Sequence, residues 1–222
     1  MDYEFLIELL GLARRFEDAG HRLNTKSIGD FNNWVIENRD IKIDIQTDFD
    51  YPGKENGRTP QSVINTMLVQ MVRYAKTYSK SAIDGSDFST QDEFIYLITL
   101  RAFGAMSKIE LVRKNVHDKP TGIQIINRLI KNGWVSQYVS QGDRRSRMVT
   151  ITDKGLATLD KQMEKIRLAS QIVTANLDLT EQMELIRLLS KLEAFHRPIY
   201  DMQLDSSILL SKAAEHLKKI QN

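Results

Sequence analysis

The chain has 222 residues, of which 41% are hydrophobic and 27% charged, and its 31 Lys and Arg nearly balance its 29 Asp and Glu. This composition is typical of a folded protein that buries a core, and the net charge of +2 is too small to identify a binder of polyanions. The chain has no cysteine, which excludes disulfides, thiolate metal ligands and thiol redox switches.

Targeting and catalytic signatures are also missing from the sequence. The first residues lack the basic segment of a signal peptide, and no apolar run approaches the ~20 residues of a membrane span. The four histidines are widely spaced, and no nucleophile, paired-carboxylate or glycine-rich phosphate motif stands out. We therefore expect a cytoplasmic protein that has no membrane contact, no metal, no cofactor and no enzymatic activity.

Residues 1–58 carry the least informative pattern. Apolar residues at helical spacing predict a helix from about Tyr3 to Ala19, and a shorter one around Asp30 to Asn38. Residues 41–46 alternate between apolar and polar, which predicts a short extended segment, and residues 51–57 read as a loop. We expect a helical N-terminal extension that is associated with a dimer interface.

A long helix is predicted within residues 59–88, with Pro60 in its first turn and apolar residues at helical spacing. Two capping boxes follow, at residues 90–93 and 107–110. In each, a hydroxyl side chain can accept a bond from the backbone of a Glu three residues later, and that Glu can bond back. The boxes predict the starts of two further helices.

A third helix is predicted from Asp118, which can act as its N-cap, to Gly133, which ends it. Its apolar positions would face a core, and its outward face is polar. On that face Gln and Asn can pair with adenine, Arg and Lys suit guanine or phosphate, and Thr suits a thymine methyl group. The candidate DNA-reading residues are Lys119, Thr121, Gln124, Asn127 and Arg128.

Two β-prone runs, residues 134–140 and 147–152, flank a polar turn and predict a β-hairpin. Its tip carries Arg144, Arg145 and Arg147, and the Arg guanidinium suits phosphates and narrow minor grooves. We expect Asp143 to pair with Arg145 and shape the tip, which leaves Arg144 and Arg147 for DNA.

Three helices followed by a hairpin predict a winged helix-turn-helix domain at residues 89–155, in a mainly α protein with a small β-wing, an α+β fold. Between residues 101 and 160 eleven Lys and Arg face only five Asp and Glu, whereas the first sixty residues are acidic. This local surplus of positive charge favours a nucleic-acid site. Ser107 and Lys108 are candidates to anchor the DNA backbone.

Residues 156–222 are predicted to form the C-terminal dimerisation helices. One follows Thr152 with a three-four apolar spacing, a second starts at Thr180 and ends before Pro198, and a third spans about Ser207 to Ile220. The long apolar stripes have little else in the chain to cover them, which favours a homodimer.

Several motifs resemble the MarR family of bacterial transcriptional regulators. They are Asn127-Arg128-Leu129 with Lys131-Asn132-Gly133, the wing 143–147, and Ile151-Thr152-Asp153-Lys154-Gly155. The resemblance covers roughly residues 62–197 and is most specific at about 89–155. It implies a homodimer that binds double-stranded DNA at a palindromic operator, usually as a repressor. It also implies dimerisation through terminal helices and, in many members, a pocket for a small-molecule effector.

The sequence departs from the family pattern in three ways. Pro120 and Gly122 replace other residue types, and we expect them to loosen the start of the reading helix. The first 58 residues have no counterpart in the minimal family domain, and the absence of cysteine excludes a thiol switch. The alternative function is a winged helix that binds a protein through its acidic N-terminal region, but such a module would not need the basic patch from Lys108 to Arg147.

Overall fold

A computed structural model describes residues 3–20, 28–37, 50–139 and 147–221. The chain divides into two compact units, residues 1–59 and 60–222. The first unit contains α1 (Tyr3–Asp18), α2 (Ile28–Glu37) and a short 3-10 helix, η1 (Lys54–Asn56). Phe16 is buried in this unit, and the rings of Phe31 and Trp34 meet it edge-on. The extended segment predicted at residues 41–46 lies outside the described residues.

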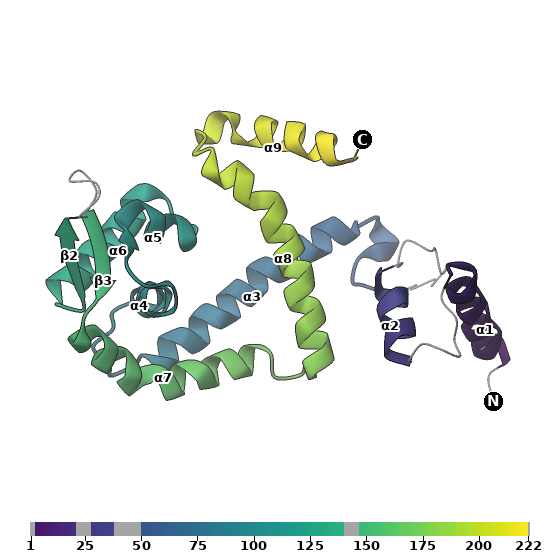
Figure 1. Ribbon diagram of the computed structural model, residues 1–222. Helices are drawn as coiled ribbons and strands as arrows, with labels where there is room; N and C mark the ends of the chain where they lie inside the picture. The colour runs from purple at the N-terminus through teal and green to yellow at the C-terminus, as the bar shows by residue number, and fades with distance from the viewer. Residues whose placement is uncertain (1–2, 21–27, 38–49, 140–146, 222) are drawn as a thin grey trace. The chain divides into compact units, whose positions relative to one another are not determined.

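The second unit carries all the strands of the described chain and the remaining helices (Figure 1). Its elements are α3 (Pro60–Ala82), α4 (Gln91–Phe103), β1 (Met106–Ser107), α5 (Lys108–Lys114), α6 (Lys119–Lys131), β2 (Val135–Val139), β3 (Arg147–Ile151), α7 (Asp153–Val173), α8 (Leu179–Asp201) and α9 (Ser206–Gln221). The mainly helical fold with a small wing is therefore confirmed.

The core of this unit lies between α4, α5, α6 and the sheet. Tyr96, Leu97, Leu111, Ile126 and Leu129 are fully buried there, and Trp134 packs edge-on against Phe88 beneath the wing. The sheet is antiparallel with the order β1-β3-β2, so the two-stranded hairpin predicted from the sequence gains a short third strand. A strand of two residues is too short to give a pattern in the sequence.

Two of the predicted helix caps are present as expected. The Asp118 side chain accepts a bond from the backbone of Thr121, and the Thr152 side chain accepts one from Gly155. At the first predicted capping box the helix does start, but the hydroxyl of Thr90 has no bonding partner. The carboxylate of Glu93 accepts from the Ser89 backbone instead, because it also faces a cation on α6.

The predicted start of α8, Thr180, lies one residue from the observed start, whereas the predicted end before Pro198 was wrong. The helix starts at Leu179 because Asp178 and Glu181 form a complete capping box. It continues through Pro198 to Asp201, although proline removes one backbone donor. Ile199 is buried in this last turn, which shows that tertiary packing holds the helix beyond the proline.

Candidate nucleic-acid interface

Helix α6 presents a polar face to solvent because its apolar residues fill the core. Asp118 fixes its first turn, with 2.9 Å between a carboxylate oxygen and the Thr121 nitrogen, and this backbone hydrogen bond lowers the pKa of Asp118. Lys119, Thr121 and Gln124 are exposed on the outer face, as the sequence predicts. These side chains have the donors and acceptors needed to read base edges in a major groove.

Gly122 tightens the start of α6 rather than loosening it, so the expectation from the sequence was wrong. The residue is buried, and a Cβ placed there would lie 2.4 Å from Cγ2 of Val112 and 2.9 Å from the Tyr96 hydroxyl. Only glycine allows α5 and α6 to approach this closely. Pro120 fits the first turn, where its missing N–H has no helical partner.

Three predicted site residues from different elements meet at one place. The Lys108 amine, at the start of α5, donates to the side-chain oxygen of Asn127 on α6 over 3.2 Å. Burial lowers the pKa of Lys108, and the positive charge of Arg147 on β3 lowers it further. Ser107 precedes Lys108 as the N-cap of α5, and its side chain accepts from the Glu110 backbone at 3.2 Å. We call Lys108, Asn127 and Arg147 the basic junction.

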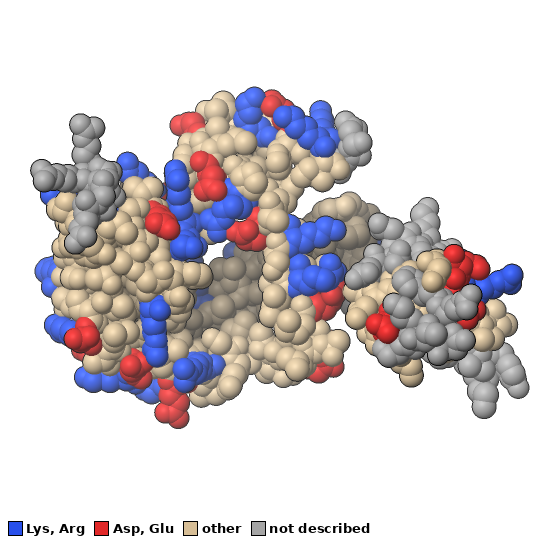
Figure 2. Space-filling model, in the orientation of Figure 1, with Lys and Arg blue, Asp and Glu red and all other residues tan. Residues whose placement is uncertain are grey.

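The two positive charges of the basic junction repel each other in the described structure, and a phosphate between them would relieve that repulsion. Separate Lys and Arg side chains also lie along the edge of the winged-helix domain, with single Asp and Glu side chains between them (Figure 2). The arrangement is therefore suited to binding an anion.

Arg128 serves a structural contact that the sequence did not suggest. Its Nε donates to a carboxylate oxygen of Glu93 on α4 over 3.0 Å, and the Glu93 side chain is only 1% exposed. The Arg128 side chain is 46% exposed, so part of its guanidinium still faces solvent. The buried Glu93 was missed because its partner lies 35 positions away in the sequence.

The wing is only partly described. Strands β2 and β3 pair in register from Val135 with Ile151 to Val139 with Arg147, and Arg147 is exposed at the start of β3. The predicted tip residues Asp143, Arg144 and Arg145 lie outside the described residues, so their roles stay predictions.

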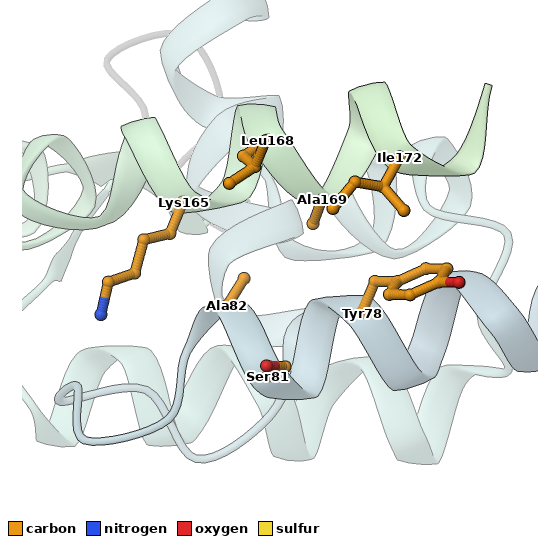
Figure 3. Close-up of a pocket in the computed structure, with 7 residues that line it drawn as sticks. All are labelled: Tyr78, Ser81, Ala82, Lys165, Leu168, Ala169 and Ile172. Carbon is orange, nitrogen blue, oxygen red and sulfur yellow. The ribbon is translucent and has the colours of Figure 1, made fainter. Parts of the chain in front are cut away.

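A cavity of about 330 Å³ lies between α3 and α7. Its walls are mostly apolar, with Lys165 reaching outward at one end and Tyr78 near the other (Figure 3). Ser81, Ala82, Leu168, Ala169 and Ile172 complete the lining. Such a site suits a small molecule with an apolar body and a negative charge.

In the parts of the chain that the structure describes, no group of three or more His, Asp or Glu side chains is placed to hold a metal ion. Within the same residues, none of the helices combines the length and the apolar character required to span a bilayer.

Comparisons with known proteins identify the family of this chain. The model of the MarR family matches residues 90–146. The HTH-type transcriptional repressor NicR of Pseudomonas putida is 30% identical over 120 residues, which cover 54% of this chain and 75% of NicR. This match spans more of the chain than the winged helix alone.

Solved structures share the fold. A probable transcriptional regulator from Pseudomonas aeruginosa is 26% identical with a TM-score of 0.53, covering 58% of this chain and 96% of that one. BpsR of Bordetella bronchiseptica, whose DNA binding is regulated by 6-hydroxynicotinic acid, is 24% identical with a TM-score of 0.54. The match covers 59% of this chain and 98% of BpsR. A mutant MarR of E. coli in complex with operator DNA is 20% identical with a TM-score of 0.55. The match covers 64% of this chain and 99% of that one.

Proposed function

Because this chain belongs to the MarR family of transcriptional regulators, which are not enzymes, we propose that it binds a palindromic DNA operator as a homodimer and represses transcription. The basic junction carries the proposal, because it places two cations and an amide beside the polar face of α6. Access to the chromosome would place the protein in the cytoplasm.

The mechanism follows from the geometry of a winged helix. In a dimer, two copies of α6 would enter successive major grooves about ten base pairs apart, and the two wings would contact the flanking backbone or minor groove. Thr121, Gln124 and Asn127 would read bases, while Lys108, Arg144 and Arg147 would neutralise phosphates and Arg145 would pair with Asp143.

The test is a gel shift with the DNA upstream of the chain's own gene and with an unrelated duplex of equal length. We expect the wild-type protein to prefer the upstream DNA, and Gln124→Ala to reduce that preference by about 1–3 kcal/mol. Lys161→Ala on α7 is the control, because this exposed lysine lies outside the proposed interface. Equal binding to both duplexes would contradict the proposal and favour a winged helix that binds proteins.

Large apolar side chains on α3, α8 and α9 support the homodimer. Met67 on α3, Met183 and Ile186 on α8 and Leu210 on α9 are each more than half exposed. Such side chains, repeated along whole helices, form an apolar surface of the kind that mediates association.

A charge on this surface would test the dimer. We expect Ile186→Glu to produce monomers in light scattering and to weaken operator binding, since a buried unpaired carboxylate is costly. Lys191→Glu, on another face of α8, is the matched control and should remain dimeric. Monomers of the wild-type chain at micromolar concentration would contradict the dimer.

We also propose that residues 1–58 enlarge the dimer interface. Ile7 and Leu10 on α1 and Ile28 on α2 are each more than two thirds exposed, which leaves apolar surface in this unit to cover. A chain that starts at Thr59 should then dissociate at lower concentrations than the full chain. If the truncated chain forms an equally stable dimer, this role is wrong.

The α3–α7 cavity supports an effector that releases DNA. We propose a small aromatic carboxylate, whose ring would contact Leu168 and Ile172 while its charge pairs with Lys165. Benzoate should raise the melting temperature of the wild-type protein and weaken operator binding, and Lys165→Met should abolish both effects. An unchanged melting temperature at millimolar benzoate would contradict this ligand class.

A further inference from the structure

The turn between α5 and α6 contains a strained residue. Val116 has a φ of 53°, in the left-handed region that β-branched residues avoid because of steric clashes. A conformation of this kind persists only where neighbouring structure holds it. The turn ends at Asp118, which caps α6, so its shape determines where the recognition helix begins.

Helix α8 holds this turn and the last turn of α5, each through one side chain. The Tyr200 hydroxyl donates to the backbone carbonyl of His117 over 2.7 Å, and a terminal nitrogen of Arg197 donates to the carbonyl of Arg113 over 2.7 Å. The donors and acceptors are 83 and 84 positions apart in the sequence. Ile199, between the two donors, is buried.

The Arg197 side chain is itself fixed in place. Its Nε donates to the Glu193 carboxylate over 2.6 Å, one turn earlier on α8, and its guanidinium lies 5.7 Å from the centre of the Tyr200 ring. Both donors therefore lie together near the C-terminal end of α8, and we call Glu193, Arg197 and Tyr200 the α8 clamp.

Helix α4 contacts the same turn from within the winged domain. The Thr99 hydroxyl donates to the Asn115 side chain over 3.1 Å, and the Tyr96 hydroxyl lies 3.2 Å from Nδ1 of His117. Burial raises the pKa of Tyr96, so its hydroxyl stays protonated at neutral pH. The turn is thus fixed on one side by the domain to which it belongs and on the other by α8.

We propose that Arg197 and Tyr200 are positioning residues that couple α8 to the recognition helix. Helix α8 also carries the apolar surface assigned above to the dimer, so a shift of this helix would move the two donors that hold the segment before α6. The inference rests on the proposed function, because it assigns the turn a role in DNA recognition. It predicts that the α8 clamp acts by keeping Val116 in its strained conformation.

Tyr200→Phe in the full-length chain tests the coupling, because it removes one hydroxyl and keeps the ring. Amide hydrogen exchange at residues 115–121 should become about fivefold faster, as expected for one lost hydrogen bond. The affinity for a duplex selected with the wild-type protein from a randomised pool should fall by a similar factor. Affinity for an unrelated duplex should stay unchanged, and Tyr74→Phe on α3, with an exposed ring, is the matched control.

A second substitution separates positioning from simple packing. Glycine adopts a positive φ without strain, so Val116→Gly in the Tyr200→Phe protein should restore both the exchange rates and the affinity. A packing defect at the end of α8 would not be rescued in this way. Unchanged exchange in Tyr200→Phe, or failure of the rescue, would overturn the coupling. If the wild-type protein selects no duplex, the proposed function fails, while the exchange measurements still decide whether the clamp holds the turn.

Discussion

Arg128 and Glu93 form an ion pair in which one partner is buried and the other half exposed, with 3.0 Å between Nε and a carboxylate oxygen. The pair joins helix α6 to the first turn of α4. Because a buried carboxylate without a cationic partner is costly, whereas an exposed guanidinium is solvated easily, the two residues contribute differently to stability.

Removing Arg128 should therefore lower the free energy of unfolding more than neutralising Glu93 does. We expect Arg128→Ala to lower the free energy of unfolding by about 2 kcal/mol, and Glu93→Gln to lower it by roughly half as much. Urea denaturation of both variants measures this difference, with Lys131→Ala on the exposed face of α6 as the control. Equal losses for the two variants would show that the carboxylate is not the costly partner.

DNA binding should depend on pH through Lys108. Burial and Arg147 lower the pKa of this amine in the free protein, and a bound phosphate would raise it again. Binding then takes up a proton, so affinity is constant below the lowered pKa and falls as the pH rises through it. Fluorescence anisotropy at constant ionic strength, with the pH raised from neutrality toward the ordinary pKa of lysine, should show this decline.

Lys108→Arg provides the control for this pH dependence. Arginine remains protonated throughout the range, so the decline in affinity should disappear while binding at neutral pH is retained. A decline of the same size in the arginine variant would assign it to another group.

The wing arginines should determine part of the salt dependence. Log affinity falls linearly with the logarithm of salt concentration, and each phosphate contact makes this fall steeper by about 0.9. Arg144→Ala together with Arg147→Ala should therefore make the slope shallower by about 2. Arg101→Ala is the control, because Arg101 pairs with Asp160 at 2.6 Å, joining α4 to α7. An unchanged slope in the double variant would exclude the wing from the interface.

The sequence predicts best those features that depend on neighbouring residues. The caps at Asp118 and Thr152 were foreseen because each side chain bonds to a backbone group three residues away. The inward and outward faces of α6 were foreseen for a similar reason, since they follow from the helical period.

Features that depend on distant residues are not predicted correctly from the sequence. The capping box expected at Thr90 is incomplete because Glu93 is drawn to Arg128, a partner on another helix. Local rules predict that α8 ends before Pro198, because proline is disfavoured in a helix. The helix continues to Asp201, and Tyr200 in its last turn bonds to a residue 83 positions away. Tertiary contacts decide both cases.

The close approach of α5 and α6 leads to a prediction at Gly122. A Cβ at this position would lie 2.4 and 2.7 Å from the two methyl groups of Val112, well inside van der Waals contact. Alanine would gain up to about 1 kcal/mol in helix propensity, but overpacking of a core costs about 1–3 kcal/mol. We expect a net loss of stability in Gly122→Ala and weaker operator binding, because α6 must move away from α5.

The compensating variant adds Val112→Ala, which removes both methyl groups that the new Cβ would meet. The double variant should recover part of the stability lost in Gly122→Ala, whereas two independent defects would add. Gly11→Ala on α1 is the matched control, because a Cβ there meets no atom within 4 Å. Urea denaturation of the wild-type protein, the two single variants, the double variant and Gly11→Ala decides the question, and wild-type stability in Gly122→Ala would show that the two helices are not held in close contact at this residue.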